Sequence, residues 1–136
     1  MSGGGPISVA LTATRNGNRI SVTGVGGGPT LAPGRPATRF NFTLTDESNC
    51  NVRFVRLDTA DECSDCPPPP GENSHQITGV VMHNALTPKT AHFTDNNSNP
   101  ASAGPIDVAY QWHFACDCPG VSVDPYDPII SNGGRV

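Results

Sequence analysis

Five cysteines are the residues of this sequence whose type and spacing best suit metal or redox chemistry. Cys63 and Cys66 form a Cys-x-x-Cys pair, Cys116 and Cys118 are separated by one residue, and Cys50 stands apart. Two thiolate pairs from separate segments are what a tetrahedral structural zinc site requires. A disulfide between the two segments, or plain buried thiols, fits the same spacing, and an odd count leaves at least one cysteine over. We therefore keep three alternatives open: zinc bound by Cys63, Cys66, Cys116 and Cys118, disulfides, or free thiols.

The cysteine pairs fit other redox chemistry poorly. A reactive Cys-x-x-Cys motif depends on a helix N-terminus to lower the thiol pKa, whereas acidic residues surround Cys63 and prolines occupy positions 67–70. A blue-copper site needs His, Cys and usually Met ligands, clustered in one late loop. Neither His nor Met follows Cys118. The sequence thus argues against both kinds of site.

One of the four histidines, His113, stands out as a candidate base or ligand. Alternation along the strand expected at 106–116 places it on a polar face with Asp107 and Gln111. No motif places a serine or cysteine nucleophile, so a solvent-facing sheet histidine is the simpler interpretation. We therefore predict no catalytic residues and no enzymatic activity.

A second set of possible ligands consists of oxygen-bearing side chains. Asp95-Asn-Asn-Ser-Asn99 has the spacing of the beginning of a calcium loop, and Asp124 and Asp127 could add oxygens from the tail. The glycine and the distal glutamate of an EF-hand are missing. Turn formation by Asx residues explains the segment more simply.

Charge and composition narrow the classes of partner. The 136 residues carry 8 basic and 12 acidic side chains, a formal charge of −4, which gives no footprint for nucleic acid or anionic lipid. No apolar stretch reaches the roughly 20 residues that a membrane span needs. The N-terminus lacks the basic and apolar regions of a signal peptide. We therefore expect no nucleic-acid partner, no membrane insertion, and a protein that is cytoplasmic or exported by a signal-independent route.

Turn chemistry and hydrophobic alternation indicate β-strands throughout. Asn16-Gly17 suits a type I′ turn between strands at 7–15 and 19–25, and pairing Arg15 with Asn18 puts the apolar residues of both on one side. Further strands are expected at 39–45, 51–57, 76–83, 90–94 and 106–116, with a bulge or strand end near Val55 and a short element near Val121. The aromatic strand at 106–116 is best placed centrally.

One domain of about this length is the usual case, so residues 1–136 are expected to form a single β-sandwich domain. An acidic, Pro- and Cys-rich excursion at 58–74 is expected to lie exposed on its surface, because four consecutive prolines favour an extended spacer. Sustained helical periodicity is lacking. The fold class predicted is all-β: an antiparallel β-sandwich of about seven strands, immunoglobulin-like or cupredoxin-like.

Three short motifs carry a resemblance to a known family. Phe93-Thr-Asp-Asn-Asn97, Tyr110-Gln-Trp-His-Phe114 and Asp127-Pro-Ile-Ile-Ser-Asn132 resemble the small bacterial proteins of the DP-EP family, whose sandwich is similar to cupredoxins. The excursion at 58–74 and the ending Gly-Gly-Arg-Val have no match in that pattern. The resemblance implies a fold but no activity.

The function expected from the sequence is a non-catalytic β-sandwich module that binds a protein partner or assembles with copies of itself, through sheet edges and loops. The alternative is a zinc-stabilised or thiol/disulfide protein built on Cys63, Cys66, Cys116 and Cys118.

Overall fold

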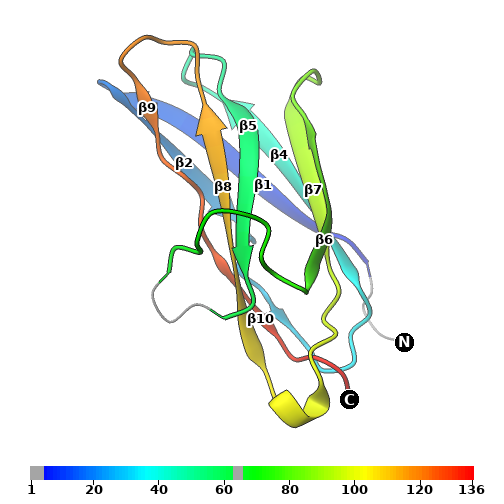
Figure 1. The fold of residues 1–136 in the computed structure, drawn as a ribbon. Helices are drawn as coiled ribbons and strands as arrows, with labels where there is room; N and C mark the ends of the chain where they lie inside the picture. Colours follow the sequence, from blue (N-terminus) through cyan, green and yellow to red (C-terminus); the bar gives the residue numbers. More distant parts are fainter. Residues whose placement is uncertain (1–4, 63–65) are drawn as a thin grey trace.

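Two β-sheets packed face to face make up the architecture in the computed structural model, which describes residues 5–62 and 66–136. One sheet has the strand order β6-β7-β4-β1-β2-β9 and the other β3-β10-β8-β5 (Figure 1). The strands are β1 (Ile7–Asn16), β2 (Arg19–Val25), β3 (Thr30–Leu31), β4 (Thr38–Asp46), β5 (Arg53–Ala60), β6 (Ile77–His83), β7 (Lys89–Asp95), β8 (Ile106–Ala115), β9 (Ser122–Val123) and β10 (Ile129–Asn132). The predicted all-β sandwich is confirmed.

The prediction of about seven purely antiparallel strands needs correction. The described residues form ten strands, because short strands at 30–31 and 129–132 add to the predicted set. Both sheets are mixed: β1 pairs with β4, β2 with β9, and β3 with β10 in parallel. Among the described residues the helical content is one short 3₁₀ turn (Ala101–Ala103), and no helix there is long and apolar enough to cross a membrane.

The first hairpin has the predicted faces but a different turn. Asn16 pairs with Arg19, so the turn residues are Gly17 and Asn18 rather than Asn16 and Gly17. Gly17 has a φ of 65°, which fits a type II′ turn with glycine in its first central position. The register moves by two residues, and an even shift leaves every side chain on its predicted face. Val9, Leu11 and Ile20 are accordingly buried.

Aromatic side chains from both sheets form the centre of the core. The ring centroid of Phe42 of β4 lies 5.5 Å from that of Trp112 and 5.7 Å from that of Tyr110, both of β8. Both contacts are edge-to-face, an arrangement that aromatic pairs prefer. Phe93 of β7 lies 5.0 Å from Tyr110. β8 is an internal strand of its sheet, and its Trp112 and Tyr110 are fully buried. The predicted central place of this strand is confirmed.

β5 contains the bulge predicted near Val55. The pairing with β8 shifts between Phe54 and Arg56, which leaves Val55 exposed while Phe54 and Leu57 are buried. The strand continues to Ala60, so Asp58 is a buried strand residue and not part of an exposed excursion. Past the residues that the structure does not describe, the chain returns along β5 and bridges Thr59 with Glu72. The prediction of an exposed excursion at 58–74 is therefore wrong for its first residues.

Candidate functional site

A disulfide joins two segments that lie far apart in the sequence. Cys50, in the loop between β4 and β5, is bonded to Cys118, which follows β8. The peptide N–H of Asp117 donates to the Cys50 carbonyl over 2.7 Å, so the two loops are also joined through their backbones. Nη1 of Arg15 lies 3.4 Å from the sulfur of Cys50 and 3.6 Å from that of Cys118. The cysteine that stands alone in the sequence is thus the partner of one in the late pair.

The cysteines named for zinc are therefore in different states. Cys118 is in a disulfide, and Cys66 is also disulfide-bonded. Cys116 is a half-buried free thiol, and Cys63 lies outside the described residues. Within residues 5–62 and 66–136, no group of three or more His, Cys, Asp or Glu side chains is placed to hold a metal. Binding zinc through Cys118 would first require reduction of its bond to Cys50.

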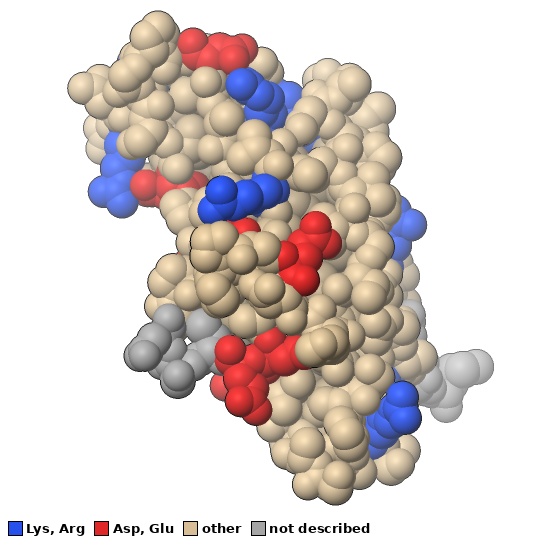
Figure 2. All heavy atoms as spheres, viewed as in Figure 1, with Lys and Arg blue, Asp and Glu red and all other residues tan. Residues whose placement is uncertain are grey.

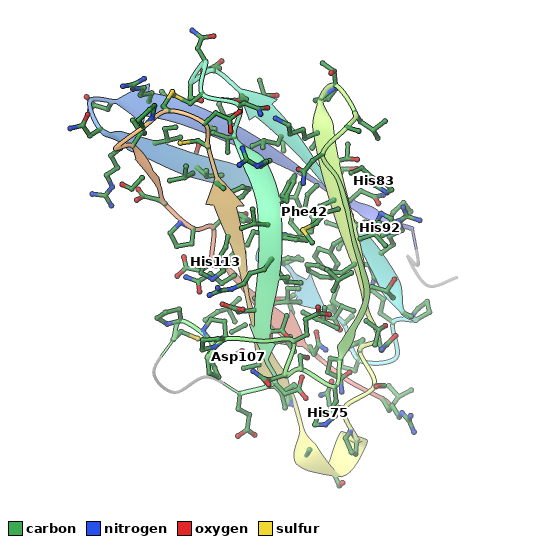
Figure 3. The ribbon with its side chains drawn as sticks, turned by 45° about the horizontal axis from the view of Figure 1, so that its top comes forward. Phe42, His75, His83, His92, Asp107 and His113 are labelled. Atoms are coloured by element: carbon green, nitrogen blue, oxygen red, sulfur yellow. A yellow bond between two sulfur atoms is a disulfide. The ribbon has the colours of Figure 1, made fainter. Side chains whose placement is uncertain are left out.

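The candidate histidine, His113, belongs to an ion-pair network around a buried carboxylate on the outer face of the four-stranded sheet. Its Nε2 lies 2.7 Å from Oδ2 of Asp58, whose side chain is 2% exposed. Arg56 reaches the same carboxylate at 3.2 Å, and the peptide N–H of Gly71 donates to its other oxygen over 2.9 Å. His113 is thus a half-buried paired histidine, whereas the simpler prediction was a solvent-facing one. Asp107, expected on the same face, lies near the start of β8, away from His113 (Figure 3).

The pKa of Asp58 shows that the network holds an ionised carboxylate. Burial opposes ionisation, but the hydrogen bonds from Gly71, Arg56 and His113 outweigh it, and the pKa falls below its ordinary value. A carboxylate only accepts hydrogen bonds, so Nε2 of His113 carries the hydrogen and donates the hydrogen bond to Asp58. With Gly71 bound to Asp58, the network fixes the returning chain onto β5.

Asp61 makes a second attachment of the same kind. It accepts hydrogen bonds from the hydroxyl of Ser74 and from the peptide N–H of His75, the latter over 2.8 Å. Burial opposes ionisation of Asp61, but these hydrogen bonds prevail and lower its pKa. Both acids act as anchors for the chain that leads into β6. We infer that their role is structural, because their hydrogen bonds go to the protein's own backbone and side chains.

Two further histidines face each other on the outer side of the six-stranded sheet. The ring centroids of His83 on β6 and His92 on β7 lie 5.5 Å apart. Figure 3 labels both residues. Nη2 of Arg39 lies 2.9 Å from Nδ1 of His92, and a guanidinium can only donate. Burial, Arg39 and His83 together lower the pKa of His92. His92 is therefore suited to stay neutral at physiological pH.

The oxygen-rich segment Asp95–Asn99 lies mostly inside the molecule. Asp95, at the end of β7, is fully buried and accepts hydrogen bonds from the peptide N–H of Asn97 over 2.9 Å and from Nδ2 of Asn132 over 2.7 Å. The first bond is an Asx turn, as predicted. Asp124, suggested as a further ligand from the tail, instead pairs with Arg19 at 2.8 Å.

A groove runs between the open edges of the two sheets. Its volume is about 350 Å³, and its apolar lining includes Val55 of β5 with Val80 and Met82 of β6. Val55 is 46% exposed and Met82 37%. On the face drawn in Figure 2 the charged side chains are scattered between broad uncharged areas. This groove combines exposed apolar side chains with the end strands of two sheets, of which β5 is partly paired along its outer edge at Phe54 and Thr59.

Comparisons with known proteins add no family to this description. No protein-family model matches the sequence, and a search of curated proteins finds no significant match. The resemblance to the DP-EP family stays a prediction.

Sequence reasoning missed the partners that define these sites. Acidic and proline-rich composition predicts a loop from Asp58 onward, whereas the strand pattern of Val52 and Phe54, continued past the bulge, places Asp58 in the strand. Cys50 had no nearby cysteine to signal its pairing. The contact of Asp95 with Asn132 joins the ends of two strands in different sheets, which no local pattern indicates.

Proposed function

We propose that this protein is a non-catalytic binding module that captures an extended peptide segment of a partner protein in the groove between β5 and β6. The observation that carries the proposal is that the end strands of the two sheets lie on either side of a groove lined by exposed apolar side chains. β5 ends the four-stranded sheet and β6 ends the six-stranded sheet, so both present backbone groups outward. An added strand satisfies such groups while its alternate side chains enter a groove.

The side-chain geometry of β6 supports this choice of surface. Met82 pairs with buried Ala91 of β7, so it points to the inner side of the sheet. It nevertheless stays 37% exposed, because opposite it β5 presents only its edge and the bulge at Val55. Part of the β5 edge is already occupied: the amide of Asn84 bonds the N–H and the carbonyl of Phe54. The free edge of β6 is therefore the better template for a peptide strand.

Selection from a random-peptide phage library tests the proposal directly. We expect enriched peptides with alternating apolar residues, whose binding weakens at least tenfold in Met82→Glu. Thr23→Glu introduces the same charge on an exposed position of β2 and should leave binding unchanged. Peptides that bind wild type and both variants equally would exclude this groove as the binding surface.

The thiol alternative has its own supporting observation: the free Cys116 is two residues from Cys118 of the disulfide, and its sulfur lies 3.8 Å from the Cys118 carbonyl oxygen. A Cys116 thiolate could attack the sulfur of Cys50, forming a Cys50–Cys116 bond and releasing the Cys118 thiolate, which then takes up a proton. The guanidinium of Arg15, 3.6 Å from the Cys118 sulfur, would stabilise the thiolate released. The number of disulfides is conserved, so no external oxidant is needed.

Alkylation of the native protein followed by peptide mapping tests this alternative. Label on Cys118 as well as on Cys116 is expected if exchange occurs, and Arg15→Gln should slow its appearance. Label confined to Cys116 would exclude exchange. For the zinc version, metal content below a tenth of an equivalent in reduced protein purified without chelator would exclude zinc at Cys63, Cys66, Cys116 and Cys118.

A further inference from the structure

Three buried side-chain oxygens near the end of β7 accept no hydrogen bond from the described part of the chain. They are Oδ2 of Asp95, Oδ1 of Asn99 and Oδ1 of Asn132. The three residues are 0%, 2% and 0% exposed. Buried polar atoms without partners are rare, and each one calls for an explanation. Here all three are acceptors, so the cluster lacks donors or positive charge.

Hydrogen bonds fix the orientation of these side chains. Nδ2 of Asn132 donates to Oδ1 of Asp95 over 2.7 Å. Nδ2 of Asn99 donates to the carbonyls of Gly104 and Asn132, over 2.9 and 3.3 Å. Flipping either amide would place its oxygen against another oxygen. The unpaired oxygens are therefore the amide oxygens themselves, and the contacts link all three residues into one cluster.

The charge of the cluster is also unbalanced. Burial raises the pKa of Asp95 to about 6, and the nearby carboxylate of Asp61 adds to the effect. None of the ion pairs within residues 5–62 and 66–136 involves Asp95. The guanidinium of Arg35 is directed to the hydroxyl of Thr38 instead, at 3.0 Å. An unpaired buried carboxylate is costly unless a cation offsets it.

We propose that Asp95, Asn99 and Asn132 bind a calcium ion. Carboxylate and amide oxygens are the ligands that Ca²⁺ prefers, and its flexible coordination tolerates an irregular set. Mg²⁺ fits less well, because it keeps several water molecules and demands an octahedral arrangement. A single carboxylate among neutral ligands corresponds to weak binding, with a Kd on the order of 1 mM. A surface groove of about 320 Å³ is lined by residues next to the cluster in the sequence, among them Asn97 and Gly134.

Calcium titration of the wild-type protein tests the proposal without any variant. In ¹H–¹⁵N spectra of chelator-treated protein, the side-chain amide signals of Asn99 and Asn132 should shift with CaCl₂ and not with MgCl₂. With a Kd of about 1 mM, 10 mM CaCl₂ should raise the Tm by roughly 4 °C. In Asp95→Asn both responses should vanish. Asp107→Asn removes the same charge from an exposed position on β8 and should keep them (Figure 3).

Three other outcomes would overturn the assignment. Amide signals of Asn99 and Asn132 that stay fixed up to 10 mM CaCl₂ would exclude calcium at this cluster. An equal rise in Tm with NaCl at matched ionic strength would indicate a general salt effect. A wild-type protein unresponsive to calcium, together with a higher Tm of Asp95→Asn at pH 7, would show that a proton satisfies the cluster.

Discussion

The disulfide between Cys50 and Cys118 should make a large contribution to the free energy of unfolding. The two cysteines are 68 residues apart, so the bond closes a loop of half the chain in the unfolded state. The loop-entropy relation gives about 4 kcal/mol for a loop of this length at 25 °C. A typical domain is stabilised by only about 5–15 kcal/mol in total. Loss of the bond should therefore bring the fold close to its limit.

Urea unfolding of the double variant Cys50→Ala/Cys118→Ala measures this contribution. The chain has one tryptophan, and Trp112 is fully buried between the sheets, so its fluorescence reports global unfolding. With an m value of about 2 kcal/mol/M, a loss of about 4 kcal/mol lowers the urea midpoint by roughly 2 M. Removing both partners also avoids leaving a new free thiol at this site.

Two controls separate the covalent bond from side-chain packing. Wild-type protein under reducing conditions loses this bond, and that of Cys66, but keeps the sulfur atoms, so it should lose at least nearly as much stability as the double variant. Cys116→Ala alters a half-buried free thiol and should change the midpoint little. A loss below about 1 kcal/mol in both the double variant and the reduced protein would refute the loop-entropy reasoning.

Three further predictions address the anchor, the core and the first turn. Asp58→Ala leaves His113 and the Gly71 N–H without their partner and should cost roughly 3 kcal/mol at pH 7. Because the pKa of Asp58 is lowered, its contribution is complete above the ordinary pKa and is lost as the pH falls through the lowered one, so urea unfolding should show a smaller deficit at pH 3 than at pH 7. Phe42→Ala removes a fully buried ring that contacts Trp112 and Tyr110 and should cost about 3–5 kcal/mol by urea unfolding, against much less for Thr43→Ala on the exposed face of the same strand. Gly17→Ala should cost about 1 kcal/mol in thermal unfolding, because Gly17 has a φ of 65°, which residues with a side chain rarely adopt. A Cβ at this position would meet no neighbouring atom, so no clash adds to the cost. Gly5→Ala, which has open space and no positive φ, should be neutral.

The sequence predicted the fold where local and periodic signals agree. Alternation at 106–116 placed Trp112 in the core, and the slip near Val55 predicted the bulge, because both depend on neighbouring residues of one strand. Strands of two residues, such as Thr30–Leu31, leave no periodic signal. The parallel pairing of β1 with β4 depends on a long-range arrangement that no turn signature specifies.

The candidate sites were harder to predict, since each depends on contacts between distant segments. Spacing alone directed attention to Cys116 and Cys118 as one pair, whereas Cys118 is bonded to a cysteine 68 residues away. The segment Asp95–Asn99 was explained by its Asx turn, and that turn is present. The turn gives no indication that Asn132, from the other sheet, also bonds to Asp95.

The unequal widths of the two sheets link the proposed groove to the rest of the fold. The six-stranded sheet is wider than the four-stranded sheet that covers it, so its end strand β6 extends past the layer opposite (Figure 1). The chain returning along β5 covers part of this overhang, held there by the bond of Gly71 to Asp58. Val80 and Met82 lie where that cover is incomplete. Loosening the anchor at Asp58 should therefore widen the groove, and peptide affinity and protein stability should change together in Asp58 variants but separately in Met82 variants.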